Sequence, residues 1–552
     1  MDENASSRKY KRVSLLLFSL AIVLGSISIY SAELKIGTYG LIHSLPPTFF
    51  VALFLLTLSF LITVKFNIKS SPFLSLHLIV LVFFLYFVAA LIEGTPRFIW
   101  VYRTYGLTES ILQNGIIDTS INQYLTWPGL MLLCAGIVEI TDLSPTTLLM
   151  WFPIVLQLIT LPLLYLILNT ISEDRRVVWI GVWLYYVASW VNQAYCMPPS
   201  YGYFVFLLII FMALLWWLGR RRVLSEKVPL LTILAILFAA IIIGHLLSSA
   251  MAISCLVILF VVLLMRRARR LRIAIPALIL ALLAVFLFTP VGEYFRTIMS
   301  EHVGLMRYAQ FELSKIYEET AWASFGGVDG STKVMYVKAA FTVVFSALAL
   351  LGLLYAVTKR MMGFNSFVAA GLIIGICIVI PIAGPYGGEI ISRAFGYCLP
   401  FLAFFAAKNL HSKLLSALLI AFLIIAPTLF VASAYGNEEA DYVSPAEIQG
   451  VEFVSQHIAG ETTVHSWEHR IWWFKNVEHI KYVGIIWYAI CRAQDHTREH
   501  YFLLGQRDVD TRMFTQGNPQ ADMDIYRQWF ELPCRARIYS SEGFELYRLL
   551  IT

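Results

Sequence analysis

EGTPRFIWVYRTYGLTESILQNGIIDTSINQYLTWPGLMLLCAGIVEITDLSP, residues 93–145, is a polar segment between long apolar runs. Charged and aromatic side chains are interleaved along it. The charged residues are Glu93, Arg97, Arg103, Glu109, Asp118, Glu139 and Asp142. The tryptophans and tyrosines between them are Trp100, Tyr102, Tyr105, Tyr124 and Trp127. These two residue types are enriched where a bilayer meets water, so the segment is predicted to be a loop at a membrane surface, held in place by the rest of the chain.

The apolar content of the whole chain indicates its class. Of the 552 residues, 59% are hydrophobic and only 14% are charged, whereas soluble domains are about half apolar and about a quarter charged. The sequence therefore predicts an all-α polytopic membrane protein rather than a globular enzyme with one anchor. The first apolar run lacks a small-residue cleavage site and is expected to stay in the protein as a helix.

Apolar stretches of about 16–25 residues predict about thirteen membrane spans. They lie near residues 13–32, 47–65, 72–92, 145–170, 177–193, 202–218, 229–244, 247–265, 273–291, 336–357, 365–384, 394–408 and 414–434. Because the number is odd, the two termini are expected on opposite sides of the membrane.

Lysine and arginine gather in alternate connections between these spans. The basic connections hold Arg8, Lys9, Lys11 and Arg12; Lys65 and Lys69; Arg175 and Arg176; Arg220, Arg221, Arg222 and Lys227; Arg266, Arg267, Arg269, Arg270 and Arg272; Lys359 and Arg360; and Lys408 and Lys413. Such residues mark the cytoplasmic side. The N-terminus is therefore predicted to be cytoplasmic in a multi-pass plasma-membrane protein. Loops 93–145 and 292–335 and the tail after about Tyr435 then face outward.

Because the basic residues lie at span boundaries, the net charge of +6 does not indicate a nucleic-acid partner.

Four cysteines fall on the outer side in this assignment, namely Cys134, Cys196, Cys491 and Cys534. The last two share the tail. A disulfide between them, formed in an oxidising compartment, and two unrelated free thiols fit the sequence equally well.

Three short helices are predicted within loop 93–145. Residues 104–113 form the first, which ends at Asn114-Gly115. Asp118 caps the second, and Trp127-Pro128-Gly129 begins the third. Helices this short suit the membrane interface rather than a span. A lipid-facing amphipathic belt is the alternative, although a belt does not require several acids near Arg97.

The loop resembles a known family. Its segments EGTPRF (93–98), YRTYG (102–106), NGIID (114–118) and YLTWPG (124–129) are similar to prokaryotic, especially archaeal, members of the GT-C superfamily of integral-membrane glycosyltransferases. Protein O-mannosyltransferases, lipid A aminoarabinose transferases and oligosaccharyltransferases belong to this superfamily. The order of elements is similar over the whole chain. Family members commonly carry an aspartate or an Asp-Glu pair after the span, where this chain has Glu93 alone, and many place the loop after the first span instead of the third.

The resemblance implies an inverting transfer of a sugar from a polyprenyl-phosphate carrier, such as dolichyl phosphate, to a lipid, glycan or protein acceptor at the outer face. The acceptor hydroxyl needs a general base. Glu93 is the first candidate for this catalytic role, followed by Asp118 and Glu109. Participation of a divalent metal such as Mg²⁺ or Mn²⁺ is left open.

The donor phosphate needs a cation, and Arg393 is the predicted ligand, with Arg97 and Arg103 beside it. An arginine at the membrane face requires an anionic partner, and its planar group matches phosphate. A salt bridge from Arg393 to Glu389 fits the sequence equally well. The two interpretations are compatible if Glu389 orients the arginine.

Other residues are expected to line the substrate cavity, namely His245, Glu389, Tyr102 and Trp127. His245 precedes Ser248 and Ser249, so a hydrogen-bonded histidine between helices is the alternative.

In loop 292–335, the glycine-rich stretch 325–331 fits either a flap over substrate or a plain connection.

The tail, residues 435–552, is predicted to form a small outward α/β domain beside the transmembrane domain, residues 1–434. Ser444-Pro445-Ala446-Glu447 is a capping box that begins a helix to about His457. Strands are expected near 462–465, 481–487 and 501–504, with a hairpin at 537–540 and 544–549. The histidine pairs His465/His469 and His496/His500 have the i,i+4 spacing of zinc ligands on a helix. Surface histidines are the ordinary interpretation.

Two other functions are alternatives to sugar transfer. A transporter or flippase of lipid-linked sugars predicts ionisable residues at mid-membrane and broken, repeated helices. The charges lie mainly at the outer mouth and no internal repeat is evident, which favours a transferase. A non-catalytic membrane subunit whose outward domain binds a partner is the third possibility.

Overall fold

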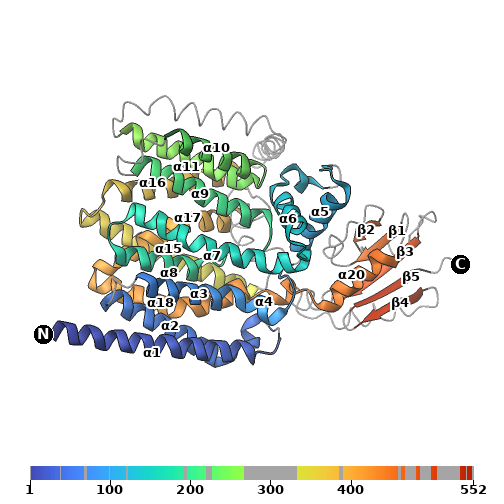
Figure 1. Cartoon of the computed structure of the whole chain (residues 1–552), viewed down its shortest axis with the longest axis horizontal. Coiled ribbons are helices and arrows are strands. Elements are labelled where there is room, and N and C mark those ends of the chain that lie inside the picture. The colour runs from blue at the N-terminus through green and yellow to red at the C-terminus, as the bar shows by residue number, and fades with distance from the viewer. Residues whose placement is uncertain are drawn as a thin grey trace, which may run out of the picture.

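A computed structural model of the chain describes a helical bundle with a β-sheet at one end (Figure 1). It describes residues 2–35, 37, 39–66, 71–98, 100–119, 122–191, 195–218, 227–265, 332–383, 389–457, 462–466, 480–484, 499–505, 535–541 and 544–549. Within this part of the chain, nine helices are long and apolar enough to cross a membrane. The prediction of an all-α polytopic membrane protein is confirmed.

The N-terminal third supplies three spans. They are α1 (Asp2–Tyr30), α2 (Pro47–Phe66) and a continuous span made of α3 (Ser71–Val82), the π-helical turn η2 (Phe83–Phe87) and α4 (Val88–Glu93). Helices α1 and α2 pack through small polar side chains, since the Ser14 hydroxyl lies 2.6 Å from that of Thr63. Gly94, in the left-handed region at φ 68°, ends α4 directly after Glu93. Glu93 is therefore the last residue of the third span.

The remaining bundle contains the predicted spans in nearly the predicted positions. Its helices are α7 (Pro145–Ile171), α8 (Arg175–Ala188), α9 (Pro198–Leu218), α10 (Lys227–Ile242), α11 (Leu246–Met265), α15 (Thr332–Thr358), α16 (Phe364–Ala383), α17 (Ile390–Ala407) and α18 (Lys413–Ala434). Polar caps fix several starts: Ser144 caps α7, Asp174 caps α8 and Ser412 caps α18. The predicted span 273–291 lies outside the described residues.

Helix α8 corrects one predicted span. It has only 14 residues and ends at Ala188, whereas the apolar run continues to residue 193, and a full span needs about 20 residues. Every residue from Val177 to Ala188 is buried. Helix α8 is therefore apolar because protein surrounds it, not because it is long enough to cross a bilayer.

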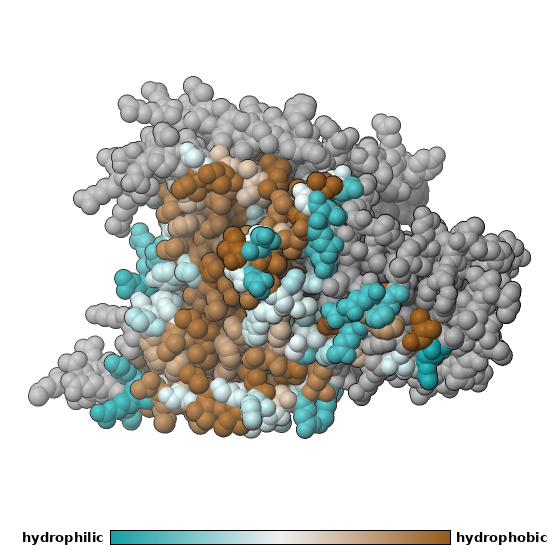
Figure 2. Space-filling view, turned by 45° about the vertical axis from the view of Figure 1, so that its right-hand side comes forward, coloured by the Kyte–Doolittle hydropathy of each residue, from teal (hydrophilic) through white to brown (hydrophobic). Residues whose placement is uncertain are grey.

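The two ends of the bundle carry different elements (Figure 1). Connections that carry Lys65, Arg175, Lys359 and Lys413 meet at the end that holds the N-terminus, which we call the basic end. There, His411 pairs with Asp174 at 3.4 Å. The opposite end carries the loop helices and the sheet, and we call it the sheet end. In Figure 2, apolar surface covers the middle of the bundle and hydrophilic side chains gather at its edges.

The sheet end contains five strands in the order β2-β1-β3-β5-β4. They are β1 (Thr462–Ser466), β2 (Ile480–Gly484), β3 (Glu499–Gly505), β4 (Arg535–Ser541) and β5 (Phe544–Leu549). Strands β2, β1 and β3 run parallel, and β5 pairs antiparallel with both β3 and β4. The predicted strands and hairpin are confirmed. His465 and His500 lie in β1 and β3, so the i,i+4 spacing does not place either of them on a helical face.

Helix α20 (Pro445–His457) connects the bundle to this sheet. Its capping box forms as predicted: the Ser444 backbone N–H donates to the Glu447 carboxylate at 2.7 Å, and the Glu447 N–H donates to the Ser444 hydroxyl at 3.2 Å. The short helix α19 (Glu438–Asp441) lies between α18 and α20.

Candidate functional site at the sheet end

Loop 93–145 folds into helices that pack against α20. Helix α5 (Val101–Asn114) ends at Gly115, which is left-handed at φ 67°, as the sequence predicted. The 3₁₀ turn η3 (Gln123–Thr126) and α6 (Gly129–Thr141) follow. Asn122 caps η3. Residues 120 and 121, which a cap at Asp118 would bind, lie outside the described residues, so that cap stays a prediction. A second apolar core joins these helices to residues 195–197 and α20, through Tyr102, Met131, Tyr195 and Val451.

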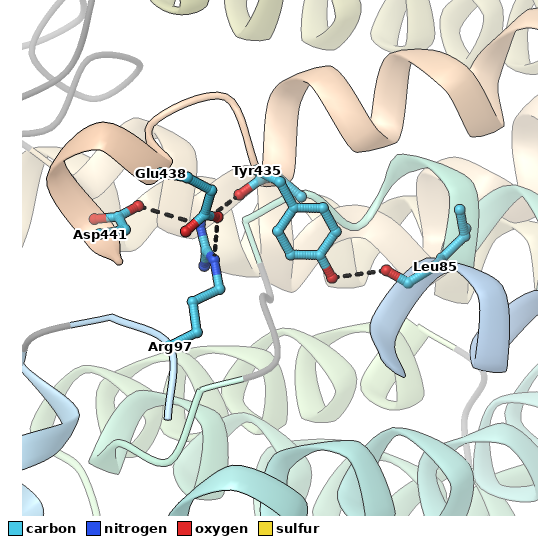
Figure 3. A network of polar contacts seen from close by, with 6 residues as sticks. Leu85, Arg97, Tyr435, Glu438 and Asp441 are labelled. Atoms are coloured by element: carbon cyan, nitrogen blue, oxygen red, sulfur yellow. Dashed lines mark hydrogen bonds and ion pairs between the residues drawn. The ribbon is translucent and has the colours of Figure 1, made fainter. Parts of the chain in front are cut away.

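Arg97 is the centre of one buried polar cluster, shown in Figure 3. Its guanidinium group forms a hydrogen-bonded ion pair with Glu438 and another with Asp441, the latter at 3.1 Å. It also donates to the Ala434 carbonyl at 2.8 Å. We call Glu93, Arg97, Glu438 and Asp441 the Arg97 cluster. It fastens the start of the loop to the connection between α18 and α20.

Two hydrogen bonds to backbone carbonyls also join the loop to this connection. The Thr95 hydroxyl donates to the Val443 carbonyl at 2.8 Å, and the Phe98 N–H donates to the Asp441 carbonyl at 3.0 Å. Phe98 itself has φ 75°, which is strained for a bulky side chain. The loop therefore adopts an unfavourable turn directly after Arg97, and contacts to the segment around Asp441 hold it there.

Glu93 is buried, with 4% of its surface exposed, and interacts with Glu438, Arg97 and Asp441. Three carboxylates thus surround one guanidinium group. Burial raises the pKa of Glu438 to about 7, Asp441 adds to the rise, and Arg97 opposes it. At neutral pH the carboxyl groups of the cluster can therefore share a proton while Arg97 carries its positive charge.

Glu438 and Asp441 were missed by the sequence analysis. The signal was present, since residues 437–441 read NEEAD directly after the last predicted span. Two acids three residues apart on one helical turn point to the same side. Arg97 lies 341 residues earlier than Glu438, so only the fold reveals which cation they meet.

Arg393 is the centre of a second cluster, in the first turn of α17. Its Nε and Nη2 donate to the Glu389 carboxylate at 3.0 and 2.7 Å, and its Nη1 donates to the Tyr195 hydroxyl at 2.9 Å. The predicted salt bridge to Glu389 therefore exists. We call Tyr195, Glu389 and Arg393 the Arg393 cluster.

A small pocket, partly open to solvent, lies against Arg393. Helices α7, α8, α9 and α17 and Tyr195 line it. Its walls include the apolar side chains of Pro153, Leu156 and Phe204. The pocket thus combines one cationic group with apolar side chains of α7 and α9, beside the polar side chains of Gln157 and Thr160.

His245 lies behind the Arg393 cluster, between α10 and α11. Its Nδ1 is 2.7 Å from the Ser248 hydroxyl, which in turn hydrogen-bonds the Tyr397 hydroxyl. Burial, assisted by the positive charge of Arg393, lowers the pKa of His245 to about 3. The ring is therefore neutral near pH 7 and belongs to a hydrogen-bonded network between helices, as the alternative interpretation expected.

The two clusters are neighbours. The ring of Phe98, next to Arg97, lies 5.2 Å from that of Tyr195, which binds Arg393. Lys338 on α15 interacts electrostatically with members of both clusters, including Asp441 and Glu389. Its ammonium group lies 5.6 Å from the Trp190 ring centroid. Lys338 was also missed, because a single lysine near the start of an apolar run was taken as part of the span.

The other predicted residues lie around these two clusters. Arg103 stacks on two aromatic rings, 4.4 Å from the centroid of Trp100 and 5.0 Å from that of Tyr124. The Tyr102 hydroxyl donates to the Pro96 carbonyl at 3.1 Å. The remaining positions are as follows: Trp127 is buried against Tyr124, Glu109 lies on α5 beside Tyr105, and Asp118 is half-buried beyond Gly115.

Several predictions fall outside the described residues. They concern most of loop 292–335, the stretch 384–388 before Glu389, the pair Cys491 and Cys534, and residues His469 and His496. In the part of the chain that is described, no three histidine, cysteine, aspartate or glutamate side chains are arranged to hold a metal ion.

Comparisons with known proteins give a likeness to solved structures but none to sequences. No protein-family model and no curated protein matches the sequence. Among solved structures, the chain is similar to the crystal structure of ArnT from Cupriavidus metallidurans bound to undecaprenyl phosphate. The TM-score is 0.49 at 10% sequence identity, and the match covers 87% of this chain and 98% of that chain.

Proposed function

We propose that this chain is a GT-C-type membrane glycosyltransferase that moves a sugar from a polyprenyl-phosphate carrier to a lipid, glycan or protein acceptor outside the cytoplasm. The proposal rests on the hydrogen bonds of Arg393 and on the pocket beside it. A guanidinium group has five N–H donors, and Glu389 and Tyr195 use three of them. The two that remain suit the phosphate of a carrier whose first isoprene units lie against Pro153, Leu156 and Phe204.

The base in this proposal is Glu93 acting together with Glu438. Two buried carboxyl groups side by side do not both ionise readily, so the pair holds one proton between them. Glu93 is preferred to Asp118 and Glu109 because it lies beside Arg97, in the cluster next to Arg393. Arg97 keeps the pair partly ionised and therefore able to accept a proton.

The reaction would then proceed as a single displacement. The acceptor hydroxyl gives its proton to the carboxylate pair, and its oxygen forms a bond to the anomeric carbon. The bond from that carbon to the phosphate oxygen breaks, and its electron pair stays on the phosphate. Arg393 stabilises the charge that develops there. One displacement inverts the anomeric centre.

The test uses the full chain purified into lipid nanodiscs, with a radiolabelled polyprenyl-phosphate sugar and release of the carrier phosphate as the readout. We expect Arg393→Ala to lower kcat/KM by at least about 100-fold, as loss of a charge-stabilising group does. The control is Lys359→Ala, an exposed residue at the basic end, which should behave as the parent. Equal donor binding by the parent and Arg393→Ala would refute the phosphate assignment.

The base assignment is tested with Glu93→Gln, which keeps the size of the side chain. General-base loss costs about 100- to 10,000-fold in kcat, with donor affinity retained. Normal transfer by Glu93→Gln, Asp118→Asn and Glu109→Gln, each folded as judged by thermal unfolding, would exclude all three carboxylates.

Lys338 favours a second candidate function, that of a transporter or flippase. It is a buried cation inside the candidate span Lys333–Thr358, and ionisable residues in spans mark transport pathways. Vesicles with a fluorescent lipid-linked sugar distinguish the two functions. Movement of the lipid across the bilayer without release of carrier phosphate would favour transport.

A further inference from the structure

Two cysteines that are distant in sequence meet at the sheet end. Cys134 lies on α6, and Cys196 lies in the segment that precedes α9. Their Sγ atoms are 3.9 Å apart across 62 residues of chain. Both side chains are buried, with 1% and 0% exposure. They lie in the second apolar core, together with Leu130 and Met197.

The backbone on both sides of this contact is fixed. The N–H of Gly129, the first residue of α6, donates to the Ile243 carbonyl at 2.8 Å. On the other side, the Ser200 N–H donates to the Met197 carbonyl at 3.0 Å. A disulfide requires an S–S distance of about 2.05 Å. Side-chain rotation therefore has to close a gap of under 2 Å, with α6 and residues 195–197 already in place.

We propose that Cys134 and Cys196 form a disulfide in the mature protein. The inference rests on the exterior placement of the sheet end and not on sugar transfer. Disulfides persist in oxidising compartments outside the cytoplasm and are rare inside it. Both cysteines lie at the end opposite the basic connections, in contact with α5, α6 and α20 rather than among the spans.

The chemistry is a thiol–disulfide exchange with an external disulfide, RSSR, as the oxidant. One cysteine thiolate attacks a sulfur of RSSR and releases RS⁻, which takes up the proton that the cysteine lost. The second cysteine then attacks the mixed disulfide and releases the second RSH. Two electrons pass from the two cysteines to RSSR, and the products are the Cys134–Cys196 bond and two RSH molecules.

Burial favours a bond made during folding and kept afterwards. The hydrogen-bonding contact with Cys134, together with burial, raises the pKa of Cys196, so little of the reactive thiolate exists once α6 has docked. A bond formed earlier is equally shielded from reductants. It would tie the catalytic loop to the segment of Tyr195, whose hydroxyl holds Arg393.

The test is mass spectrometry of the full chain from its native membranes. The membranes are dissolved in detergent with N-ethylmaleimide, which blocks free thiols, and digested without reductant. We expect most copies to give one linked peptide that contains Cys134 and Cys196 and disappears on reduction. Recovery of both residues as N-ethylmaleimide adducts in most copies would overturn the proposal.

A matched control lies within the bundle. Cys377 on α16 and Cys398 on α17 also interact with each other, but both are inside candidate spans. We expect both to be alkylated. A Cys377–Cys398 link at the same level would show oxidation during handling and remove support for the proposal. In Cys196→Ser, Cys134 should become fully alkylated; if it stays blocked, its partner is a different cysteine and the proposal fails.

Discussion

Arg97 is buried and Arg393 is partly buried at the same end of the bundle, and their surroundings differ. Arg97 has two carboxylate partners and a backbone carbonyl. Arg393 has one carboxylate and one hydroxyl. The first arrangement sets two carboxylates against one cation and joins two segments of chain. The second leaves donors beside a pocket, so the two arginines are suited to structure and to ligand binding respectively.

Loss of Arg97 should destabilise the protein. In Arg97→Ala, Glu438 and Asp441 are left buried without their cation, which typically costs about 3–5 kcal/mol. Thermal unfolding followed by intrinsic fluorescence should show a clearly lower Tm. The double variant Arg97→Met with Glu438→Leu removes both charges and should recover part of the loss. Equal Tm values for Arg97→Ala and the parent would contradict the structural role of this cluster.

Glu438 should make stability depend on pH between about 4.5 and 7. Its pKa is raised from 4.5 to about 7 in the folded protein, so between these values the folded state holds a proton that the unfolded state has lost. Stability is therefore highest at the acid end of the window and falls as pH rises through it, by up to about 3 kcal/mol. Glu438→Gln should flatten this slope. An unchanged slope would show that another group causes it.

Sequence reasoning found the charged residues with unusual local surroundings and missed their distant partners. Glu93 and Arg393 lie beside apolar runs, where a charged side chain is costly and therefore indicates a functional or structural role. Their neighbours Glu438 and Tyr195 are separated from them by 345 and 198 residues. No local pattern encodes such contacts. The alternative in which Glu389 binds Arg393 was correct because its i,i+4 spacing is local.

At the level of elements, caps and turns were predictable because they depend on neighbouring residues. The capping box at Ser444 and the helix end at Asn114-Gly115 formed as expected. The cap at Asn122, which begins η3, was not predicted. The predicted length of α8 was wrong, since composition alone does not distinguish burial in protein from burial in lipid.

Two glycines test the turn that ends α5. Gly115 has φ 67°, whereas Gly136 lies inside α6, and an added Cβ would meet no atom within 4 Å at either position. Gly115→Ala should lower stability by about 1 kcal/mol because alanine resists a left-handed conformation. Gly136→Ala should raise it by up to about 1 kcal/mol through helix propensity. Chemical denaturation measures both, and a stabilising Gly115→Ala would contradict the described turn.

On the scale of the whole molecule, the loop helices, α20 and the sheet lie at one end, and the basic connections lie at the other (Figure 1). The Arg97 cluster is the link between loop 93–145 and the tail, since it binds the start of one to the start of the other. The pocket beside Arg393 therefore lies at the same end of the bundle as the Arg97 cluster. Which compartment that end meets depends on the direction in which the basic end faces.

The positive-inside rule predicts that the basic end faces the cytoplasm, and cysteine labelling tests this. Glu139 on α6 and Lys359 at the end of α15 are both exposed, at opposite ends of the bundle. Each is replaced by cysteine in a background without Cys377, Cys491 and Cys534. In intact cells, a membrane-impermeant maleimide should label Glu139→Cys and spare Lys359→Cys until the membrane is permeabilised, because only the sheet end meets the exterior. The reverse pattern would place the Arg393 pocket in the cytoplasm, where neither an extracytoplasmic transfer nor a stable Cys134–Cys196 disulfide is expected.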